Sequence, residues 1–342
     1  MIKKVKIKEA IGMVLAHDIT RIIPGKFKGA AFKKGHIIKK EDIPEFLNIG
    51  KEHVYVLELT QDEIHENEAG IEIANAIAGD GITFSPPSEG KVNLKASYKG
   101  LLKIKVPLLE EINSIDDIVI STLHNNTICT PEMVVAGTRI IPLFTKKSII
   151  EKVKDICLKE GKLIEILPFK KMLVGVIITG NEVYKGRIKD KFGDIIQKKI
   201  EAFNSKIIKR IITPDDTKII SDSILELKSL KVDIIIACGG LSVDPDDVTK
   251  KGVEKSGAKI ISYGAPVLPG SMFLYALHNE VPILGAPACV LHHKATIFDL
   301  ILPKILVGEK LSRSDIIKLG HGGLCQNCPK CTYPICPFGR GL

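Results

Sequence analysis

Between residues 171 and 309 the sequence alternates unbroken apolar runs with amphipathic segments. Runs such as MLVGVIITG and VDIIIACGG carry no polar alternation, which is typical of parallel strands buried on both faces. Segments between them, such as DTKIISDSILELKSL, have the spacing of helices that bury one face. Because strands alternate with helices, we predict a three-layer α/β domain with a mostly parallel sheet over residues 171–309.

Three glycine-containing loops follow predicted strands of this sheet. They read TGNEV, CGGLSVDPDDVT and LGAPACV. In open α/β sheets, ligands bind outside the carboxyl ends of the strands, so these loops are the expected site. In the first loop, Gly180 permits a tight turn, and Thr179 and Asn181 offer a hydroxyl and an amide. A further turn, APVLPG, brings Pro269 and Gly270 to the same region.

The second loop has the strongest chemical character. Gly239 and Gly240 let backbone amides approach an anion without a Cβ in the way. Ser242 adds a hydroxyl, and the next helix is expected to aim its N-terminus at a phosphate. Acidic residues around Asp244 and Asp247 beside a phosphate indicate Mg²⁺. The alternative is that one aspartate only caps the helix.

Five motifs in this order resemble those of one family. TGNEV, ITPDD, GGLSVDPDDVT, the PG of APVLPG and LGAPA are similar to the motifs of the molybdopterin-binding domain. Molybdopterin adenylyltransferases and molybdopterin molybdenumtransferases share that domain. The resemblance covers about residues 172–309 and implies binding of molybdopterin or its adenylylated form, with Mg²⁺.

The resemblance also implies roles for individual residues. Asp247 matches the family's aspartate in the GG-x-S loop. Together with Asp244, which the acidic cluster and not the resemblance indicates, it would position the metal and polarise the phosphoanhydride. The residues expected to contact the ligand are Thr179, Gly180, Asn181, Glu182, Asp216, Gly239, Gly240, Ser242, Pro269, Gly270, Gly285 and Pro287.

The chain departs from the family pattern at three places. Asp244 stands where the last glycine of GG-x-S-x-G is usual, and Ser271 stands where molybdenumtransferases have a molybdate-contacting lysine. The PGNP loop appears as LGAPAC. Losing a cation from an oxyanion site weakens molybdate capture. Two functions therefore stay open: insertion of molybdate into adenylylated molybdopterin, or a non-catalytic carrier or sensor of the cofactor.

Before this α/β domain, residues 1–165 are expected to form smaller strand-rich domains. Residues 1–66 read as an α+β block, with a helix at Lys40–Leu47 and a strand at His53–Leu59. LAHDI and AFKKGHII in this block resemble the start of molybdenumtransferases. In residues 67–165, LLKIKVPLL, DIVISTL and TRIIPLF read as strands, and Lys147–Lys159 reads as a helix.

Residues 320–342 contain four of the eight cysteines, spaced C-x₂-C-x₂-C-x₄-C. These are Cys325, Cys328, Cys331 and Cys336. Four thiolates hold zinc or an iron–sulfur cluster. Because the spacing is close to the ferredoxin-type run, we favour [4Fe–4S] over Zn²⁺. We expect this metal-binding tail to be a local loop beyond the last helix, ordered only by its metal.

The net charge of +9 suits an anionic partner or a lysine-rich surface. Without an arginine-rich arm or interleaved aromatic residues, nucleic acid is not favoured. There is no signal peptide and no apolar run of membrane-spanning length, so a soluble cytoplasmic protein is expected. Expected partners are molybdate and a molybdoenzyme or another cofactor-maturation protein, and analogy with the family suggests a homo-oligomer.

Overall fold

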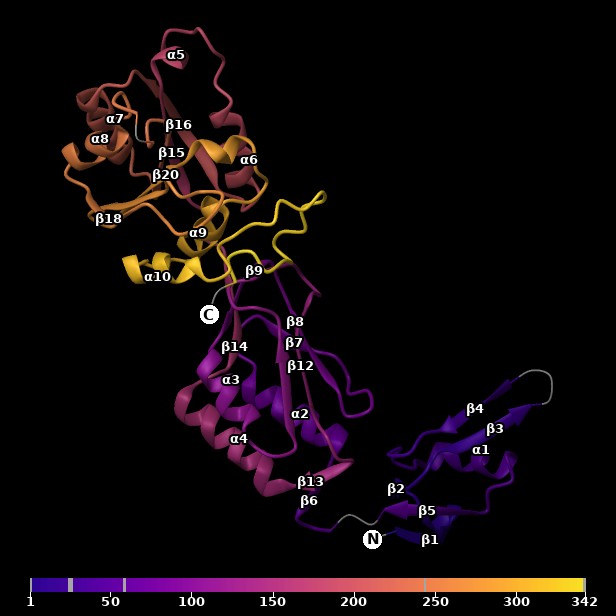
Figure 1. The fold of residues 1–342 in the computed structure, drawn as a ribbon. Helices are drawn as coiled ribbons and strands as arrows, with labels where there is room; N and C mark the ends of the chain where they lie inside the picture. The colour runs from indigo at the N-terminus through magenta and orange to yellow at the C-terminus, as the bar shows by residue number, and fades with distance from the viewer. Residues whose placement is uncertain (1, 24–26, 58–59, 243, 341–342) are drawn as a thin grey trace. The chain divides into compact units, whose positions relative to one another are not determined.

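A computed structural model describes residues 2–23, 27–57, 60–242 and 244–340 (Figure 1). The chain divides into two compact units. The first unit comprises residues 1–97, 104–123 and 131–165, and the second comprises residues 98–103, 124–130 and 166–342.

The first unit is rich in antiparallel strands. Residues 2–57 form a three-stranded sheet, β1-β5-β2, and a hairpin, β3-β4. Its elements are β1 (Ile2–Lys6), β2 (Val14–Leu15), β3 (Ile19–Ile23), β4 (Phe27–Phe32), η2 (Lys40–Asp42), α1 (Ile43–Asn48) and β5 (His53–Leu57). The predicted helix at 40–47 is therefore present, and the last two residues of the strand predicted at 53–59 lie outside the described residues.

Residues 63–97, 104–123 and 131–165 form a second part of the first unit around the four-stranded antiparallel sheet β10-β12-β8-β7. Its helices are α2 (Glu66–Ile77), α3 (Val106–Asn113) and α4 (Lys147–Glu160). Its strands are β6 (Glu63–His65), β7 (Ile82–Phe84), β8 (Val92–Ala96), β10 (Ile118–Thr122), β12 (Val134–Ile140) and β13 (Phe144–Lys146).

One strand prediction in this region is wrong at its end. LLKIKVPLL was expected to be a single strand, but β9 (Gly100–Ile104) stops before Pro107 and α3 begins at Val106. Proline is well tolerated in the first turn of a helix and poorly in a strand, so it marks the change. Strands β11 (Ile128–Cys129), β9 and β14 (Ile164–Pro168) form a small sheet.

The second unit is built on a six-stranded mixed sheet. Its order is β16-β15-β17-β20-β19-β18. Strands β16, β15, β17 and β20 are parallel to one another. Strand β19 pairs antiparallel with both β20 and β18. The strands are β15 (Leu173–Thr179), β16 (Lys206–Thr213), β17 (Ile234–Cys238), β18 (Lys259–Tyr263), β19 (Leu274–His278) and β20 (Val281–Ala286).

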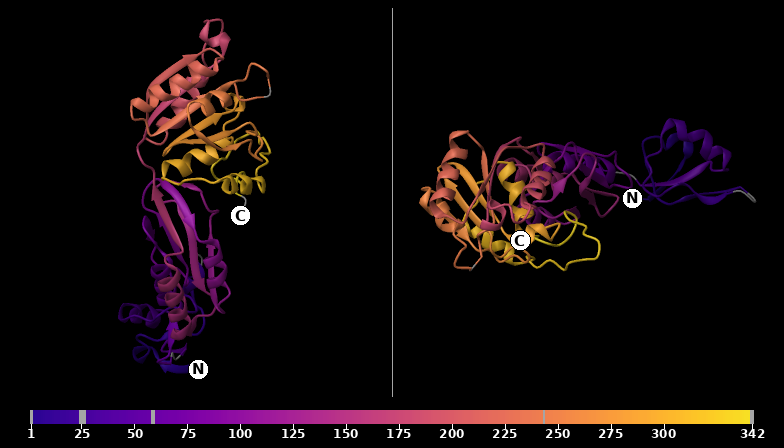
Figure 2. Two further views of the ribbon diagram at one scale, coloured as in Figure 1. Left: turned by 90° about the vertical axis from the view of Figure 1, so that its left-hand side faces the viewer. Right: turned by 90° about the horizontal axis from the view of Figure 1, so that it is seen from above.

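Helices cover both faces of this sheet, which confirms the predicted α/β domain (Figures 1 and 2). Alternate residues of β15 and β17 point to opposite faces. On one face they pack against α6 (Phe192–Glu201) and α9 (Ile297–Leu306), and on the other against α7 (Thr217–Ser229) and α8 (Thr249–Lys255). Ile178 belongs to the first cluster and Ile177 to the second.

The last long helix begins later than its pattern suggests. VLHHKATIFDLILPKIL reads as one helix, but η3 (Ala288–Leu291) is separate and α9 begins after Thr296. The Thr296 hydroxyl accepts from the Phe298 N–H at 3.2 Å, and Asp299 accepts from the Thr296 N–H at 2.8 Å. This capping box fixes the start of α9. His292, His293 and Lys294 consequently lie in an irregular segment.

The cysteine tail follows α10 (Arg313–Ile317) and η4 (Lys318–Gly320), and it is not the independent loop that we expected. Phe338 is buried in the core cluster beneath α9, and Tyr333 and Cys336 pack against that cluster. The Tyr333 hydroxyl donates to the Asp299 carbonyl at 2.7 Å. The tail therefore belongs to the core of the second unit.

Within the described residues, no helix has both the length and the apolar character needed to cross a bilayer.

Candidate functional site

The three glycine loops meet at one cavity of about 550 Å³ at the carboxyl ends of β15, β17 and β20. Such a volume suits a small organic ligand. Its lining includes these residues expected from the sequence: Thr179, Gly180, Glu182, Gly239, Gly240, Ser242, Asp247, Pro269, Gly270 and Pro287.

The first two loops are held together by a buried pair of threonines. The Thr179 and Thr249 hydroxyls lie 3.1 Å apart, and the Thr249 hydroxyl donates to the Gly239 carbonyl at 2.9 Å. Gly239 and Gly240 have φ of +88° and +58°. A Cβ at Gly240 would lie 2.5 Å from the Thr249 hydroxyl. Glycine is thus required here by the packing of the loops as well as by their turn.

Helix α8, which we expected to aim its N-terminus at a phosphate, begins against the Gly239–Gly240 loop. It has only seven residues, Thr249–Lys255, and its first N–H donates to the Gly240 carbonyl at 3.1 Å. The Thr249 side chain is buried between the loops. An N-terminus whose first amide is already bonded inside the protein contributes less to anion binding. The Thr249 amide is therefore not free for a ligand, and a role of α8 in phosphate binding stays a prediction.

The acidic loop is organised by its own backbone. The Asp247 carboxylate accepts from the Ser242 N–H at 2.6 Å and lines the cavity. The Asp244 carboxylate accepts from the Asp246 N–H at 3.0 Å, and Asp244 is exposed outside the cavity lining. Of the two residues predicted to position the metal, only Asp247 therefore faces the cavity.

Three other predicted contact residues also lie outside the lining. Asp216 caps α7, where its carboxylate accepts from the Lys218 and Ile219 amides. Gly285 lies within β20 beneath Leu274 and Leu241. Asn181 is exposed, and its N–H donates to Asp215 at 2.8 Å.

Asp215, which the sequence reasoning missed, lines the cavity in place of Asp216. Its only signal was its position beside Asp216 in ITPDD. Burial raises the pKa of the Asp215 carboxyl above its ordinary value. The carboxylates of Glu182 and Asp247 act in the same direction, while the hydrogen bond from the Asn181 N–H opposes them.

The cavity is acidic. Among the described residues that line it, none is lysine, arginine or histidine, whereas Glu182, Asp215 and Asp247 are carboxylates. A phosphate would be repelled unless a cation came with it. In the described part of the chain, no three histidine, cysteine or acidic side chains are already arranged to hold a metal ion. Mg²⁺ commonly binds through one or two carboxylates together with substrate phosphates, so a complete protein cage is not required.

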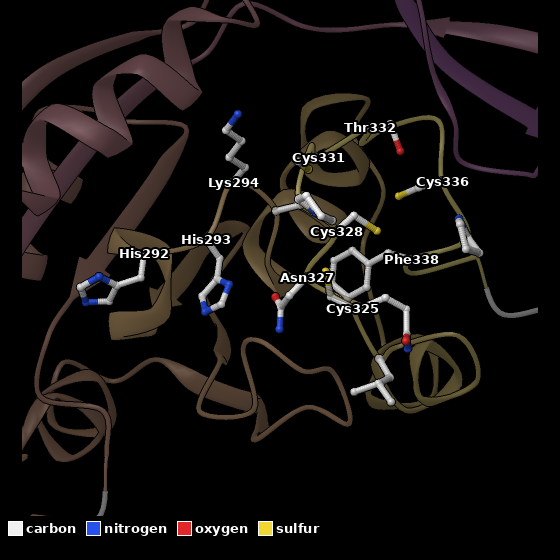
Figure 3. A pocket seen from close by; sticks show the side chains of 15 residues that line it. His292, His293, Lys294, Cys325, Asn327, Cys328, Cys331, Thr332, Cys336 and Phe338 are labelled. Carbon is white, nitrogen blue, oxygen red and sulfur yellow. The ribbon is translucent and has the colours of Figure 1, made fainter.

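A second pocket, of about 360 Å³, contains all four tail cysteines (Figure 3). The thiol groups of Cys328 and Cys336 are directed into the same hollow beside Phe338. Among the described residues, no three of these thiols are arranged to hold a metal ion. The tail cysteines are nevertheless neighbours in space as well as in sequence.

Basic side chains complete this cysteine pocket. His292, His293 and Lys294 come from the irregular segment before α9. Among the described lining residues there is no aspartate or glutamate. A metal ion or cluster held by four thiolates would have a net negative charge, which the Lys294 ammonium group would partly offset.

Two parts of the chain match family models. Residues 175–306 match the model described as "Probable molybdopterin binding domain". Residues 4–58 match the model of a domain of unknown function.

Curated relatives match parts of the chain. A molybdopterin molybdenumtransferase of Haemophilus influenzae is 25% identical over 155 residues, which is 43% of this chain and 38% of that protein. A CinA-like protein of Thermosipho melanesiensis is 27% identical over 108 residues, 31% of this chain and 27% of the relative. The chain thus spans well under half of the length of these relatives.

Solved structures resemble a similar share of the chain. The protein CinA of Thermoplasma acidophilum, described as having unknown function, covers 40% of this chain and 98% of its own length, with 17% identity and a TM-score of 0.35. The molybdopterin biosynthesis enzyme MoaB of Thermus thermophilus covers 40% and 98%, with 16% identity and a TM-score of 0.33.

Proposed function

We propose that this chain binds molybdopterin or its adenylylated form during molybdenum cofactor biosynthesis. The proposal starts from the match of residues 175–306 to the molybdopterin-binding domain family. The observation that carries the proposal is the single cavity into which the TGNEV loop, the GGLS loop and the Pro269–Gly270 turn all open. Its volume of about 550 Å³ is adequate for a pterin with a phosphate-bearing side chain.

Mg²⁺ would enter this cavity with the ligand's phosphates. Asp247 and Asp215 would hold it, and Glu182 lies beside them. The metal would neutralise phosphate charge and polarise the phosphoanhydride of an adenylylated ligand. Because burial and neighbouring carboxylates raise the pKa of Asp215, a bound cation would also relieve their mutual repulsion.

The proposed activity is transfer of molybdate to adenylylated molybdopterin with release of adenylate. The chain's own residues would bind the phosphates through Mg²⁺ and orient the pterin between the Gly239–Ser242 loop and Pro269–Gly270. The alternative is a non-catalytic carrier or sensor that delivers cofactor to a molybdoenzyme. Ser271 favours the carrier or sensor, because it stands where a lysine would contact molybdate. Among the described residues that line the cavity, no basic side chain takes over that contact.

Mass spectrometry of the pterin that co-purifies with the full chain tests the proposal. Adenylylated pterin would support the transferase, molybdenum-bearing pterin the carrier, and absence of any pterin from cells that make the cofactor would contradict both. We expect Asp247→Asn to reduce pterin recovery on the order of tenfold, the size of one lost charge-assisted contact.

The Asp247→Asn variant should stay folded. Asp247 is half-buried, and the amide carbonyl of asparagine can still accept from the Ser242 N–H. Asp222→Asn, an exposed site on α7 outside the cavity, is the matched control and should retain wild-type pterin. Equal pterin recovery from both variants would remove Asp247 from the site.

The Ser271→Lys variant should place a positively charged side chain at the cavity wall, where molybdenumtransferases have a lysine. Ser271 is exposed at the cavity wall, so a lysine can extend into the opening without displacing core atoms. We expect molybdate binding, measured by equilibrium dialysis, to strengthen on the order of tenfold, as for one new charged hydrogen bond. Ser271→Gln supplies similar length without charge. If the two variants bind molybdate equally, the oxyanion does not sit at this position.

For the tail we propose one metal centre bound by Cys325, Cys328, Cys331 and Cys336, with [4Fe–4S] favoured over zinc because of the ferredoxin-like spacing. The common pocket of these cysteines and its basic lining support the proposal. The thiols would have to move to meet at one centre, and metal binding would supply the free energy for that rearrangement.

A further inference from the structure

The wall of the ligand cavity is hydrogen-bonded directly to the cysteine tail. The Leu268 N–H donates to the Gly323 carbonyl at 2.8 Å, and the Cys325 N–H donates to the Leu268 carbonyl at 2.8 Å. Leu268 lines the ligand cavity, whereas Cys325 lines the cysteine pocket. One short backbone bridge therefore joins the first tail cysteine to the Pro269–Gly270 turn.

A second link runs through the loop after β20. Pro287 and Cys289 line the ligand cavity, and His292 and His293 line the cysteine pocket. The N–H groups of both histidines donate to the Cys289 carbonyl at 3.0 Å. This compact turn makes the segment between the two pockets a connected unit.

The segment around Cys328 is anchored less firmly than the rest of the tail. Phe338 is buried in the core, and Cys325 and Cys336 pack against it. Cys328 is exposed. Because no three of the thiols are arranged to hold a metal ion, binding a metal must draw the segment around Cys328 toward the anchored parts of the tail. Any such closure acts on Cys325 and hence on its partner Leu268.

We propose that a thiolate-bound metal centre in the cysteine pocket controls the ligand cavity. Binding of the metal to four cysteines releases four thiol protons and fixes the tail. The fixed tail holds Leu268 and the Pro269–Gly270 turn in place. A cavity wall that is ordered in advance loses less entropy when the ligand binds, so metal loading strengthens ligand binding. This last step rests on the proposed molybdopterin function, whereas the ordering of the wall does not.

Hydrogen exchange tests the ordering step without any pterin. The full chain would be purified anaerobically, stripped with a chelator, and then loaded with Zn²⁺ or reconstituted with iron and sulfide. We expect slower exchange at residues 266–272 in the loaded protein than in the stripped protein. Cys328→Ser should abolish both metal retention and this protection. Cys157→Ser, a cysteine of the first unit, is the matched control and should retain both.

Molybdopterin binding to the same samples, measured by pterin fluorescence after oxidation, tests the second step. We expect affinity to rise on the order of tenfold with loading, within the usual range of coupling between sites. If neither sample binds pterin but protection still rises, the proposed function fails and the metal control of the wall stands. If metal binds without changing exchange at residues 266–272, or if neither iron nor zinc is retained, the inference is overturned. Iron and zinc contents decide which centre is present.

Discussion

Gly270→Ala should lower the free energy of unfolding of the second unit by on the order of 3 kcal/mol, from backbone strain and overpacking together. Gly270 has φ of +130°, a region that side chains with a Cβ rarely adopt. An added Cβ would lie 2.3 Å from Cγ2 of Ile297 and 3.0 Å from its backbone nitrogen. Ile297 is fully buried at the start of α9, so it has little room to move. Chemical denaturation of the full chain, followed by circular dichroism, measures the loss.

The Gly186→Ala variant is the control that separates backbone strain from the steric clash with Ile297. Gly186 also has a positive φ, +69°, but nothing lies within 4 Å of the position of an added Cβ. Its variant should lose only about 1 kcal/mol, the usual cost of a left-handed conformation. A Gly270→Ala variant no less stable than Gly186→Ala would mean that the turn can move away from α9. The cavity wall would then not be rigidly set by α9.

The central parallel strands β15 and β17 could be predicted because they are buried on both faces. The edge strand β16 is only partly buried and could be predicted from its residue types. A run such as KIIKRIIT carries enough β-branched residues to read as a strand at any position, and β16 spans those same residues, Lys206–Thr213. Parallel strands also place their carboxyl ends together, so the meeting of the glycine loops at one cavity followed from the order of the elements.

The choice between adjacent side chains could not be predicted. In ITPDD, both aspartates are equally acidic, and the direction of the first turn of α7 decides that Asp216 caps the helix while Asp215 faces the cavity. The start of α9 was missed for a related reason. Apolar residues continue the helical spacing upstream of Thr296, but its capping box with Asp299 ends that continuity.

The packing of the tail was missed because the cysteine spacing describes only local chemistry. The contacts that fix the tail are made by other residues and reach far along the chain. The Tyr333 hydroxyl contacts Asp299, and Arg340 donates to the carbonyl of Asn125 at 3.3 Å. No periodic pattern in so short an irregular segment indicates which residue is buried. Phe338 is the side chain on which this difference can be tested.

Phe338→Ala should lower the free energy of unfolding by about 3–5 kcal/mol even in metal-free protein, the usual cost of deleting a buried aromatic ring. Phe338 is 5% exposed in the core cluster, whereas Ile335, three residues earlier, is 51% exposed. Ile335→Ala should therefore change stability by less than about 0.5 kcal/mol. Both variants keep the four cysteines, so denaturation after chelation compares packing alone. Equal, small losses in the two variants would mean that the metal-free tail is detached from the domain, and the link from the cysteine pocket to Leu268 would lose its anchor.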